Sequence, residues 1–128
     1  MTAGTEHDHE LDSDLVSIIM PTYNCGAFIA ETIATVQAQT HPRWELIVVD
    51  DCSTDDTTDV VGALAKDDPR IRYVRLETNS GAAMARNRAM ELAQGRYMAF
   101  LDSDDLWHPD KLRRQIDFMS SRDVAMSC

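Results

Sequence analysis

The sequence predicts an α/β fold in which a parallel sheet is flanked by helices. Two observations predict it. Short, almost wholly apolar runs recur along the chain, and between them apolar residues return three and four positions apart, which is helical spacing. Each intervening stretch is long enough for a crossover helix, and strands joined by such helices run parallel in one sheet.

The first half of the pattern gives two strands and one helix. Residues 15–20 form a nearly all-apolar run, as expected for a strand buried on both faces, and Pro21 is predicted to halt it. A helix is predicted over residues 26–39 from its helical spacing, and the second strand over residues 44–49.

The pattern then repeats. Residues 53–57 supply N-cap chemistry for a helix that continues to about Lys66. The sequence Asp-Asp-Pro at 67–69 breaks that helix, and the apolar residues within 71–76 predict the third strand.

The last part of the chain adds a further strand and two helices. Residues 79–81 turn the chain into a helix that Gly95 ends, and residues 96–101 form the fourth predicted strand. Pro109 suits the first position of the final helix. Residues 124–128 begin another apolar stretch, so we expect a fifth strand there and a fold truncated before its second half.

Length and composition are typical of one soluble globular domain. The chain has 128 residues, of which 44% are hydrophobic and 27% are charged. No apolar run approaches the ~18 residues of a membrane span, so we expect no span in this segment and a cytoplasmic location. The cysteines Cys25, Cys52 and Cys128 form neither a disulfide framework nor a zinc-ligand spacing.

The net charge of −10 is unevenly distributed. Residues 1–14 are acidic and nearly devoid of apolar residues, which predicts a disordered acidic leader before a folded part at 15–128. The first basic residue is Arg43. An acidic chain without basic clusters argues against nucleic-acid binding, which needs a positive surface.

Polar residues follow three of the predicted strands, in the segments 21–24, 50–53 and 102–105. The carboxyl ends of parallel strands lie along one edge of a sheet, and open α/β sheets bind their ligands at that edge. We therefore expect these segments to converge on one site, although they are far apart in the sequence.

The segment 102–105 contains the pattern Asp-x-Asp. Asp102 and Asp104 lie on the same side of an extended segment, so both carboxylates can reach one cation. Carboxylate oxygens suit a divalent cation whose other ligands are water and substrate phosphates, and such a cation would screen a diphosphate in an acidic site. A solvated acidic turn that caps a helix is the alternative.

The other strand ends carry residues suited to a nucleotide. Tyr23 offers a stacking face for a flat base, and a carboxylate such as Asp50 can accept a hydrogen bond from a ribose hydroxyl or base N–H. The alternatives are a packed turn aromatic for Tyr23 and a strand-end cap for Asp50. Arg86 and Arg88 face different sides of their helix, so at most one points toward this edge.

Several function classes are excluded by missing patterns. No glycine-rich dinucleotide or Walker loop follows the first strand, which argues against a nicotinamide or flavin dehydrogenase. No Ser/His/Asp or Cys/His set is arranged for nucleophilic catalysis. A receiver-like signalling domain needs a lysine at a strand end, but the only lysines, Lys66 and Lys111, fall in predicted helices.

The chain resembles glycosyltransferase family 2 in four linked motifs whose order and spacing also match. The motifs are Val16-Ser-Ile-Ile-Met-Pro-Thr-Tyr-Asn24, Trp44-Glu-Leu-Ile-Val-Val-Asp-Asp-Cys-Ser53 with Asp55, Asn79-x-Gly81 with Ala85-Arg-Asn87, and Phe100-Leu-Asp-Ser-Asp-Asp105. The resemblance covers about residues 15–128.

The resemblance implies a GT-A fold, in which a Rossmann-like half that binds a nucleotide sugar precedes an acceptor half. It implies inverting transfer, of the hexosyltransferase type, from a nucleoside-diphosphate sugar that is often UDP-linked, with Mn²⁺ or Mg²⁺. The acceptor would be a saccharide or lipid-linked, as in cell-surface polysaccharide biosynthesis, so membrane association through other parts stays open.

The resemblance also implies roles for individual residues. Pro21 and Tyr23 would line the base pocket, Asp51 would contact the uracil with Asp50 beside it, Gly81 and Arg86 would lie near the diphosphate, Asp102 would approach the ribose and metal, and Asp104 would be the main metal ligand. The family's general base follows in the second half, so none is assigned within residues 1–128. A non-catalytic nucleotide- or metal-binding module is the alternative.

Overall fold

The computed structural model describes residues 15–102, 105–122 and 126–127, with side chains described as far as residue 118. The predicted acidic leader therefore lies outside the described residues. The elements are β1 (Val16–Thr22), α2 (Ile29–Gln37), β2 (Trp44–Asp50), α3 (Thr57–Asp67), β3 (Ile71–Arg75), α4 (Ala82–Leu92), β4 (Tyr97–Phe100), α5 (Lys111–Arg122) and β5 (Met126–Ser127).

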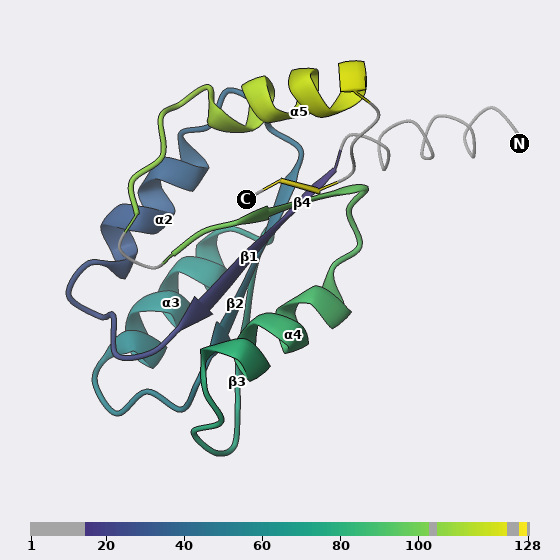
Figure 1. Cartoon of the computed structure of the whole chain (residues 1–128). Coiled ribbons are helices and arrows are strands. Elements are labelled where there is room, and N and C mark those ends of the chain that lie inside the picture. The colour runs from purple at the N-terminus through teal and green to yellow at the C-terminus, as the bar shows by residue number, and fades with distance from the viewer. Residues whose placement is uncertain (1–14, 103–104, 123–125, 128) are drawn as a thin grey trace, which may run out of the picture.

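The strands form one sheet in the order β3-β2-β1-β4-β5, and every neighbouring pair is parallel (Figure 1). This confirms the α/β prediction and its parallel strands. A two-residue fifth strand lies where the final apolar stretch predicted one.

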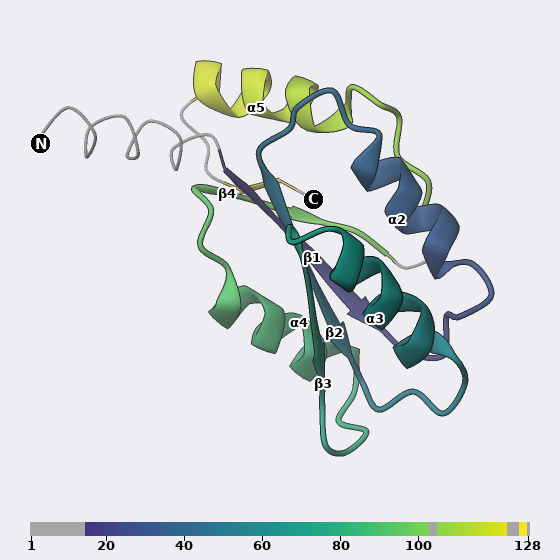
Figure 2. The ribbon, with the colours of Figure 1, turned by 180° about the vertical axis from the view of Figure 1, so that it is seen from behind.

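Helices cover both faces of the sheet. α2, α3 and α5 pack on one face and α4 on the other, as the two opposite views show (Figures 1 and 2). Successive residues of a strand point to opposite faces. In β1, accordingly, Ile18 packs among the residues of α2 and α3, whereas Ile19 packs against α4.

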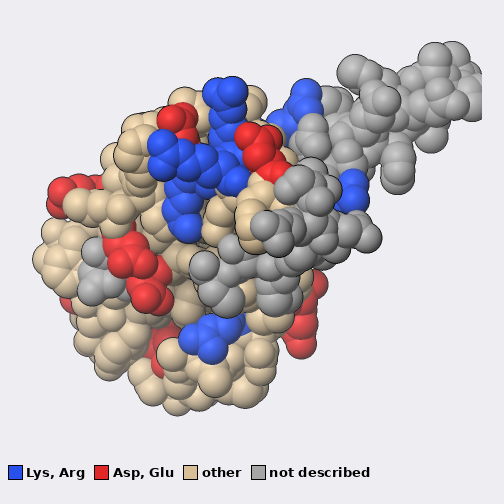
Figure 3. Space-filling view, turned by 45° about the horizontal axis from the view of Figure 1, so that its top comes forward, with Lys and Arg blue, Asp and Glu red and all other residues tan. Residues whose placement is uncertain are grey.

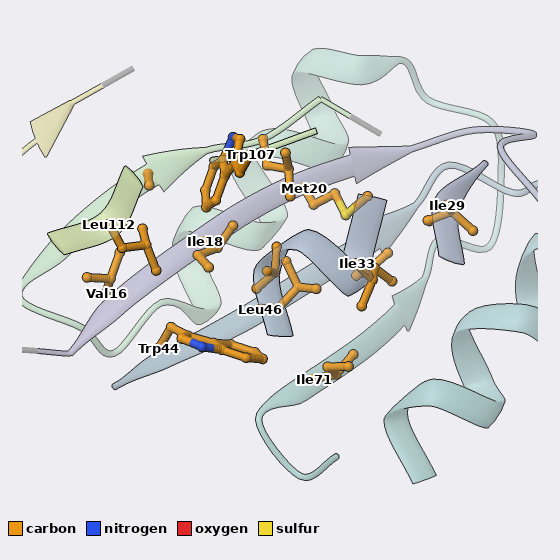
Figure 4. Packing of buried hydrophobic residues seen from close by; sticks show 14 of the residues in the cluster. Val16, Ile18, Met20, Ile29, Ile33, Trp44, Leu46, Ile71, Trp107 and Leu112 are labelled. Atoms are coloured by element: carbon orange, nitrogen blue, oxygen red, sulfur yellow. The ribbon is translucent and has the colours of Figure 1, made fainter. Parts of the chain in front are cut away.

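The larger core lies on the α2–α3–α5 face. Ile18, Leu46 and Ile33 are fully buried there, and Trp107 and Leu112 close it toward α5 (Figure 4). The opposite face is thinner because α4 approaches the sheet through alanines, Ala85 and Ala89. Trp107 is thus a core residue of this sheet.

The prediction that Pro21 halts the first strand was wrong, because β1 continues to Thr22. Ile19 accepts a hydrogen bond from Leu101 N (3.0 Å), and Thr22 accepts one from Asp51 N (2.8 Å). The nitrogen of Pro21 therefore faces the β4 side, where β4 has already ended, so its missing N–H removes no sheet hydrogen bond.

Two helices begin later than predicted, because a turn precedes each of them. Phe28 N and Ile29 N both donate to Cys25 O, at 3.1 Å and 2.9 Å, so α2 starts after this turn. Likewise, Lys111 N donates to His108 O (3.0 Å), and α5 starts at Lys111, two positions after Pro109.

Candidate functional site

The sheet has a switch point between β1 and β4. From β1 the chain passes to β2 and β3 on one side and only later returns to β4 on the other. Crevices at such a point, outside the carboxyl ends of the strands, are the usual ligand sites of open α/β sheets.

A pocket of about 610 Å³ lies at this edge, and we call it the edge pocket. Its lining comes from the end of β1, from the segments that follow β1, β2, β3 and β4, and from the first half of α4. The lining residues are Pro21, Thr22, Tyr23, Asn24, Cys25, Phe28, Asp51, Asn79, Ala82, Ala85, Arg86 and Asp102.

The structure brings most of the predicted site residues to this pocket. Those in its lining are Pro21, Tyr23, Asp51, Arg86 and Asp102. Three others do not line it: Asp50 is fully buried, Gly81 directly precedes the lining residue Ala82, and Asp104 lies outside the described residues.

Aromatic rings stand at the rim of the edge pocket. Tyr23 is 48% exposed and Phe28 is 46% exposed. A packed turn aromatic would be buried, so the exposure of Tyr23 favours the stacking interpretation. Both rings are available to stack on a planar group, an interaction worth ~1–3 kcal/mol per base.

Asp51 links the end of β2 to the start of α4. Its Oδ1 accepts a hydrogen bond from Ser80 N (2.6 Å) and its Oδ2 accepts one from Gly81 N (2.9 Å). Asn79 Nδ2 also donates to Asp51 O (3.2 Å). Each carboxylate oxygen has two lone pairs, so Asp51 can accept a further hydrogen bond from a ligand in the pocket.

Gly81 provides the backbone conformation that this contact needs. Its φ is +99°, a region that residues with a Cβ rarely adopt. This conformation lets Gly81 donate its N–H to Asp51 immediately before α4 begins. Gly81 therefore supports the pocket through its backbone.

Asp50, next to Asp51, points to the opposite side of the strand. It is fully buried and accepts hydrogen bonds from Ser53 N (3.0 Å), from Ser53 Oγ and from the Tyr73 hydroxyl. These contacts are those of a strand-end cap, the alternative that the sequence left open for this carboxylate.

Asn24 joins the loops after β1 and β2, a role that sequence reasoning missed. Its Oδ1 accepts hydrogen bonds from Thr54 N (2.8 Å) and Asp55 N (3.3 Å), while its own N–H donates to Ser53 Oγ (2.8 Å). Its φ is +50°, a conformation that asparagine adopts more readily than most residues. An asparagine just after a strand was the available signal.

Asp55 strengthens the same junction. Its carboxylate accepts hydrogen bonds from the hydroxyl and N–H of Thr57 and from Gly26 N. These bonds, the Thr57 hydroxyl first, lower the pKa of Asp55. Because the pKa is lowered, these hydrogen bonds stabilise the folded state fully at pH values above the ordinary pKa of an aspartate. This stabilisation is lost as the pH falls through the lowered pKa.

Only one of the two arginines of α4 that the sequence singled out reaches the pocket. Arg86 lines it, whereas Arg88 is exposed and pairs with Glu91 at 3.1 Å. An adjoining hollow of about 400 Å³ shares Pro21, Arg86 and Asp102 with the edge pocket. Its other lining residues are the apolar Ile19, Met90, Phe100 and Leu101.

The described residues supply part of the predicted metal site. Asp102 is exposed at the carboxyl end of β4 and lines both hollows. Within residues 15–102, 105–122 and 126–127, no cluster of three or more His, Cys, Asp or Glu residues could hold a metal ion. One exposed carboxylate at a pocket wall still fits a hard cation that takes its other ligands from water, phosphate and a second carboxylate.

Positive charge gathers away from this edge. Lys and Arg side chains crowd the end of the molecule that carries α5 (Figure 3). A hollow of about 460 Å³ at the start of α5 is lined by Asp105, Leu106, Trp107, His108, Lys111, Arg114 and Gln115, none of which lines the edge pocket. Burial lowers the pKa of Lys111, whose Nζ lies 4.9 Å from the centre of the Trp107 ring.

None of the helices in the described part of the chain is both long enough and apolar enough to cross a membrane.

The fold and the pocket define a Rossmann-like α/β protein with a ligand crevice at the switch point of its sheet. The chain belongs to glycosyl transferase family 2, whose family model matches residues 17–128.

Curated relatives share both sequence and family. The putative teichuronic acid biosynthesis glycosyltransferase TuaG of Bacillus subtilis (strain 168) is 57% identical over 113 residues, which are 88% of this chain. The UDP-Glc:alpha-D-GlcNAc-diphosphoundecaprenol beta-1,3-glucosyltransferase WfgD of Escherichia coli is 46% identical over 115 residues, or 90% of the chain. The chain spans 45% of the length of each of these relatives.

Solved structures match the fold. S. aureus TarS 1-349 in complex with UDP-GlcNAc has a TM-score of 0.79 and 35% identity, over 84% of this chain and 32% of that one. The mannosyltransferase PcManGT from Pyrobaculum calidifontis, in complex with GDP-Man and Mn²⁺, has a TM-score of 0.77 and 32% identity, over 82% of this chain and 32% of that one. The Rossmann-like sheet with flanking helices is thus that of the GT-A fold.

Proposed function

We propose that this chain binds a nucleoside-diphosphate sugar, UDP-linked, in the edge pocket and presents it for inverting transfer to a saccharide or lipid-linked acceptor. One observation carries the proposal: Pro21, Tyr23, Asp51, Arg86 and Asp102, which come from three strand ends and one helix, line the same pocket. A solvated acidic turn at the end of β4 would not require the other four residues to meet there.

The base would lie between Tyr23 and Asp51. The exposed ring of Tyr23 offers a stacking face, and the free lone pairs of the Asp51 carboxylate can accept a base N–H. The TarS complexes with UDP and UDP-GlcNAc support a uracil base. The PcManGT complex holds GDP-Man, so a comparison of UDP with GDP is the informative test of base preference.

The diphosphate would lie toward α4. The N-terminus of a helix attracts anions through its free N–H groups and its dipole. Ala82, the first residue of α4, lines the pocket, as does the guanidinium-bearing Arg86 one turn further along. Together they offer the positive end of a helix and a cation on the same wall.

The divalent cation would be held by Asp102 and Asp104. Its chemistry, when Mn²⁺ or Mg²⁺ is bound, is to offset the negative charge of the departing nucleoside diphosphate. Mn²⁺ in the PcManGT complex supports the choice of cation. The name of WfgD gives a lipid-linked diphosphate sugar as its acceptor. This supports a lipid-linked acceptor for this protein too, and a reaction that takes place at a membrane surface.

Binding of UDP is expected to depend on the metal. In isothermal titration calorimetry of this chain with UDP, replacing Mn²⁺ by EDTA should weaken binding about tenfold or more, because two unscreened carboxylates then repel the diphosphate. Asp104→Asn should weaken metal-dependent binding to a similar degree.

Asp105→Asn is the matched control, since it removes a neighbouring carboxylate that lines the α5 hollow and not the edge pocket. It should leave the Kd for UDP unchanged. A Kd that is the same with Mn²⁺, with EDTA and in Asp104→Asn would refute the metal assignment.

A further inference from the structure

We propose that Tyr73 is a positioning residue for the edge pocket and acts on it through the buried carboxylate of Asp50. The consequence for ligand affinity rests on the proposed function, whereas the consequence for the pocket loops does not. Tyr73 lies on β3, the edge strand of the sheet, and is absent from the pocket lining.

Tyr73 belongs to a polar cluster at the end of β2 whose central residue, Asp50, is buried. Val48 pairs with Tyr73 in the sheet register, so the tyrosine lies beside the carboxyl-terminal part of strand β2, on the face that carries α3. Its hydroxyl donates a hydrogen bond to Asp50 Oδ2 at 2.5 Å and lies 2.8 Å from Thr58 Oγ1, at the start of α3. Asp50 itself is fully buried.

The cluster extends from Asp50 to the wall formed by the loop after β1. Asp50 Oδ1 accepts hydrogen bonds from both Ser53 N and Ser53 Oγ. Because the Ser53 hydroxyl donates its hydrogen to Asp50, its oxygen can accept a hydrogen bond. It accepts one from the backbone N–H of Asn24, at 2.8 Å. Asn24 immediately follows the rim residue Tyr23.

The same cluster fixes the turn that carries Asp51. Between Asp50 and Ser53 the chain passes through Cys52, whose φ of +66° is uncommon for a residue other than glycine. Such a conformation persists only where the surroundings hold it. The hydrogen bonds from Ser53 to Asp50 close this turn, and Asp51, a residue of the pocket lining, lies inside it.

The tyrosine is suited to be a permanent donor. Burial and the hydrogen bond to Asp50 raise the pKa of Tyr73 to about 12. Its hydroxyl therefore stays protonated, and keeps donating to Asp50, throughout the pH range in which the protein would be assayed. Loss of the Tyr73 hydroxyl removes one of the hydrogen bonds that the buried Asp50 carboxylate accepts. This loss favours rearrangement of the turn between Asp50 and Ser53.

The test is Tyr73→Phe, with Tyr97→Phe as the matched control. Tyr97, like Tyr73, is a sheet tyrosine, and it is the more buried of the two, at 3% exposure. It lies at the start of β4 and pairs with Val16, at the end of the sheet away from the pocket. Amide hydrogen exchange is measured by NMR at Asn24 and Ser53, the two N–H groups that the cluster holds. Binding of UDP with Mn²⁺ is measured by calorimetry well below the melting temperature.

In Tyr73→Phe we expect exchange at Asn24 and Ser53 to be about tenfold faster and the Kd for UDP to rise about fivefold to tenfold, the effect of losing one hydrogen bond to a charged group. Tyr97→Phe should change neither quantity. A merely structural tyrosine would lower the melting temperature of Tyr73→Phe while leaving the two amides and the Kd as they are, and that result overturns the proposal.

The two arms separate this inference from the proposed function. If the wild-type chain fails to bind UDP, the proposal that it binds the sugar donor fails. The exchange rates in Tyr73→Phe then decide the positioning role by themselves: faster exchange at Asn24 and Ser53 supports it, and unchanged exchange refutes it. If Tyr73→Phe does not fold, Ser53→Ala tests the same connection nearer the pocket. It should speed exchange at Asn24 and weaken UDP binding, and no effect on either contradicts the proposal.

Discussion

Asp51→Ala is expected to weaken UDP binding to this chain about 100-fold, the largest ligand effect of any substitution in the pocket. The change removes the carboxylate of Asp51, a nearly buried residue of the pocket lining that is proposed to contact the base, and with it the acceptor for Ser80 N and Gly81 N. The start of α4 loses its anchor at the same time as the base loses its partner. Isothermal titration calorimetry with UDP and Mn²⁺ measures the effect.

Glu77→Ala is the control for Asp51→Ala. Glu77 is an exposed carboxylate in the same stretch between β3 and α4, and it does not line the pocket. Glu77→Ala removes one negative charge but no hydrogen bond to a pocket residue, so the Kd for UDP should stay within a factor of about two of the wild-type value. Equal Kd values for the two variants would contradict the role of Asp51.

Gly95→Ala is expected to have the largest effect on stability, a loss of about 3 kcal/mol in the free energy of unfolding. A Cβ at this position would lie 2.6 Å from Leu15 O, 2.8 Å from Ser17 Oγ and 2.9 Å from Ser17 N. Two of these atoms belong to the backbone, so the strand itself must shift. Gly95 N also donates to Ser17 Oγ (2.8 Å), a bond that the shift would disturb.

Gly62→Ala is the matched control for this prediction. Gly62 lies inside α3, and a Cβ there would have no atom within 4 Å apart from its chain neighbours and the backbone of its own helix. Alanine should therefore stabilise the protein by about 0.5–1 kcal/mol, because the unfolded chain then has less backbone conformational entropy to lose when the helix forms. Urea denaturation of both variants gives the comparison. A Gly95→Ala variant that is as stable as the wild type, or more stable, would contradict the close backbone contacts around Gly95.

The fold was predictable because its determinants are local. Apolar runs, helical spacing and breakers such as Asp67-Asp68-Pro69 place every main strand and helix. The errors fall at ends where a backbone turn decides the boundary, as at Cys25 and His108. Pro21 misled the prediction because its effect depends on where the neighbouring strand β4 ends, which the sequence of β1 does not reveal.

The site was predictable as far as it depends on strand ends. Parallel strands bring Tyr23, Asp51 and Asp102 to one edge whatever the details of packing. Because adjacent residues of a strand point to opposite faces of the sheet, only one of Asp50 and Asp51 was expected to line the pocket. The family resemblance indicated Asp51 for the pocket. The partner of Asp50 on β3, Tyr73, depends on the register between β2 and β3, which the sequence does not show.

The most direct test of the proposal that the edge pocket binds a nucleotide is a titration of the wild-type chain with UDP and Mg²⁺, followed by amide NMR spectra. Chemical-shift changes should concentrate at Tyr23, Asp51, Gly81 and Arg86. Changes that instead concentrate at the start of α5, around Lys111, or no changes at all, would contradict the assignment of the edge pocket as the nucleotide site.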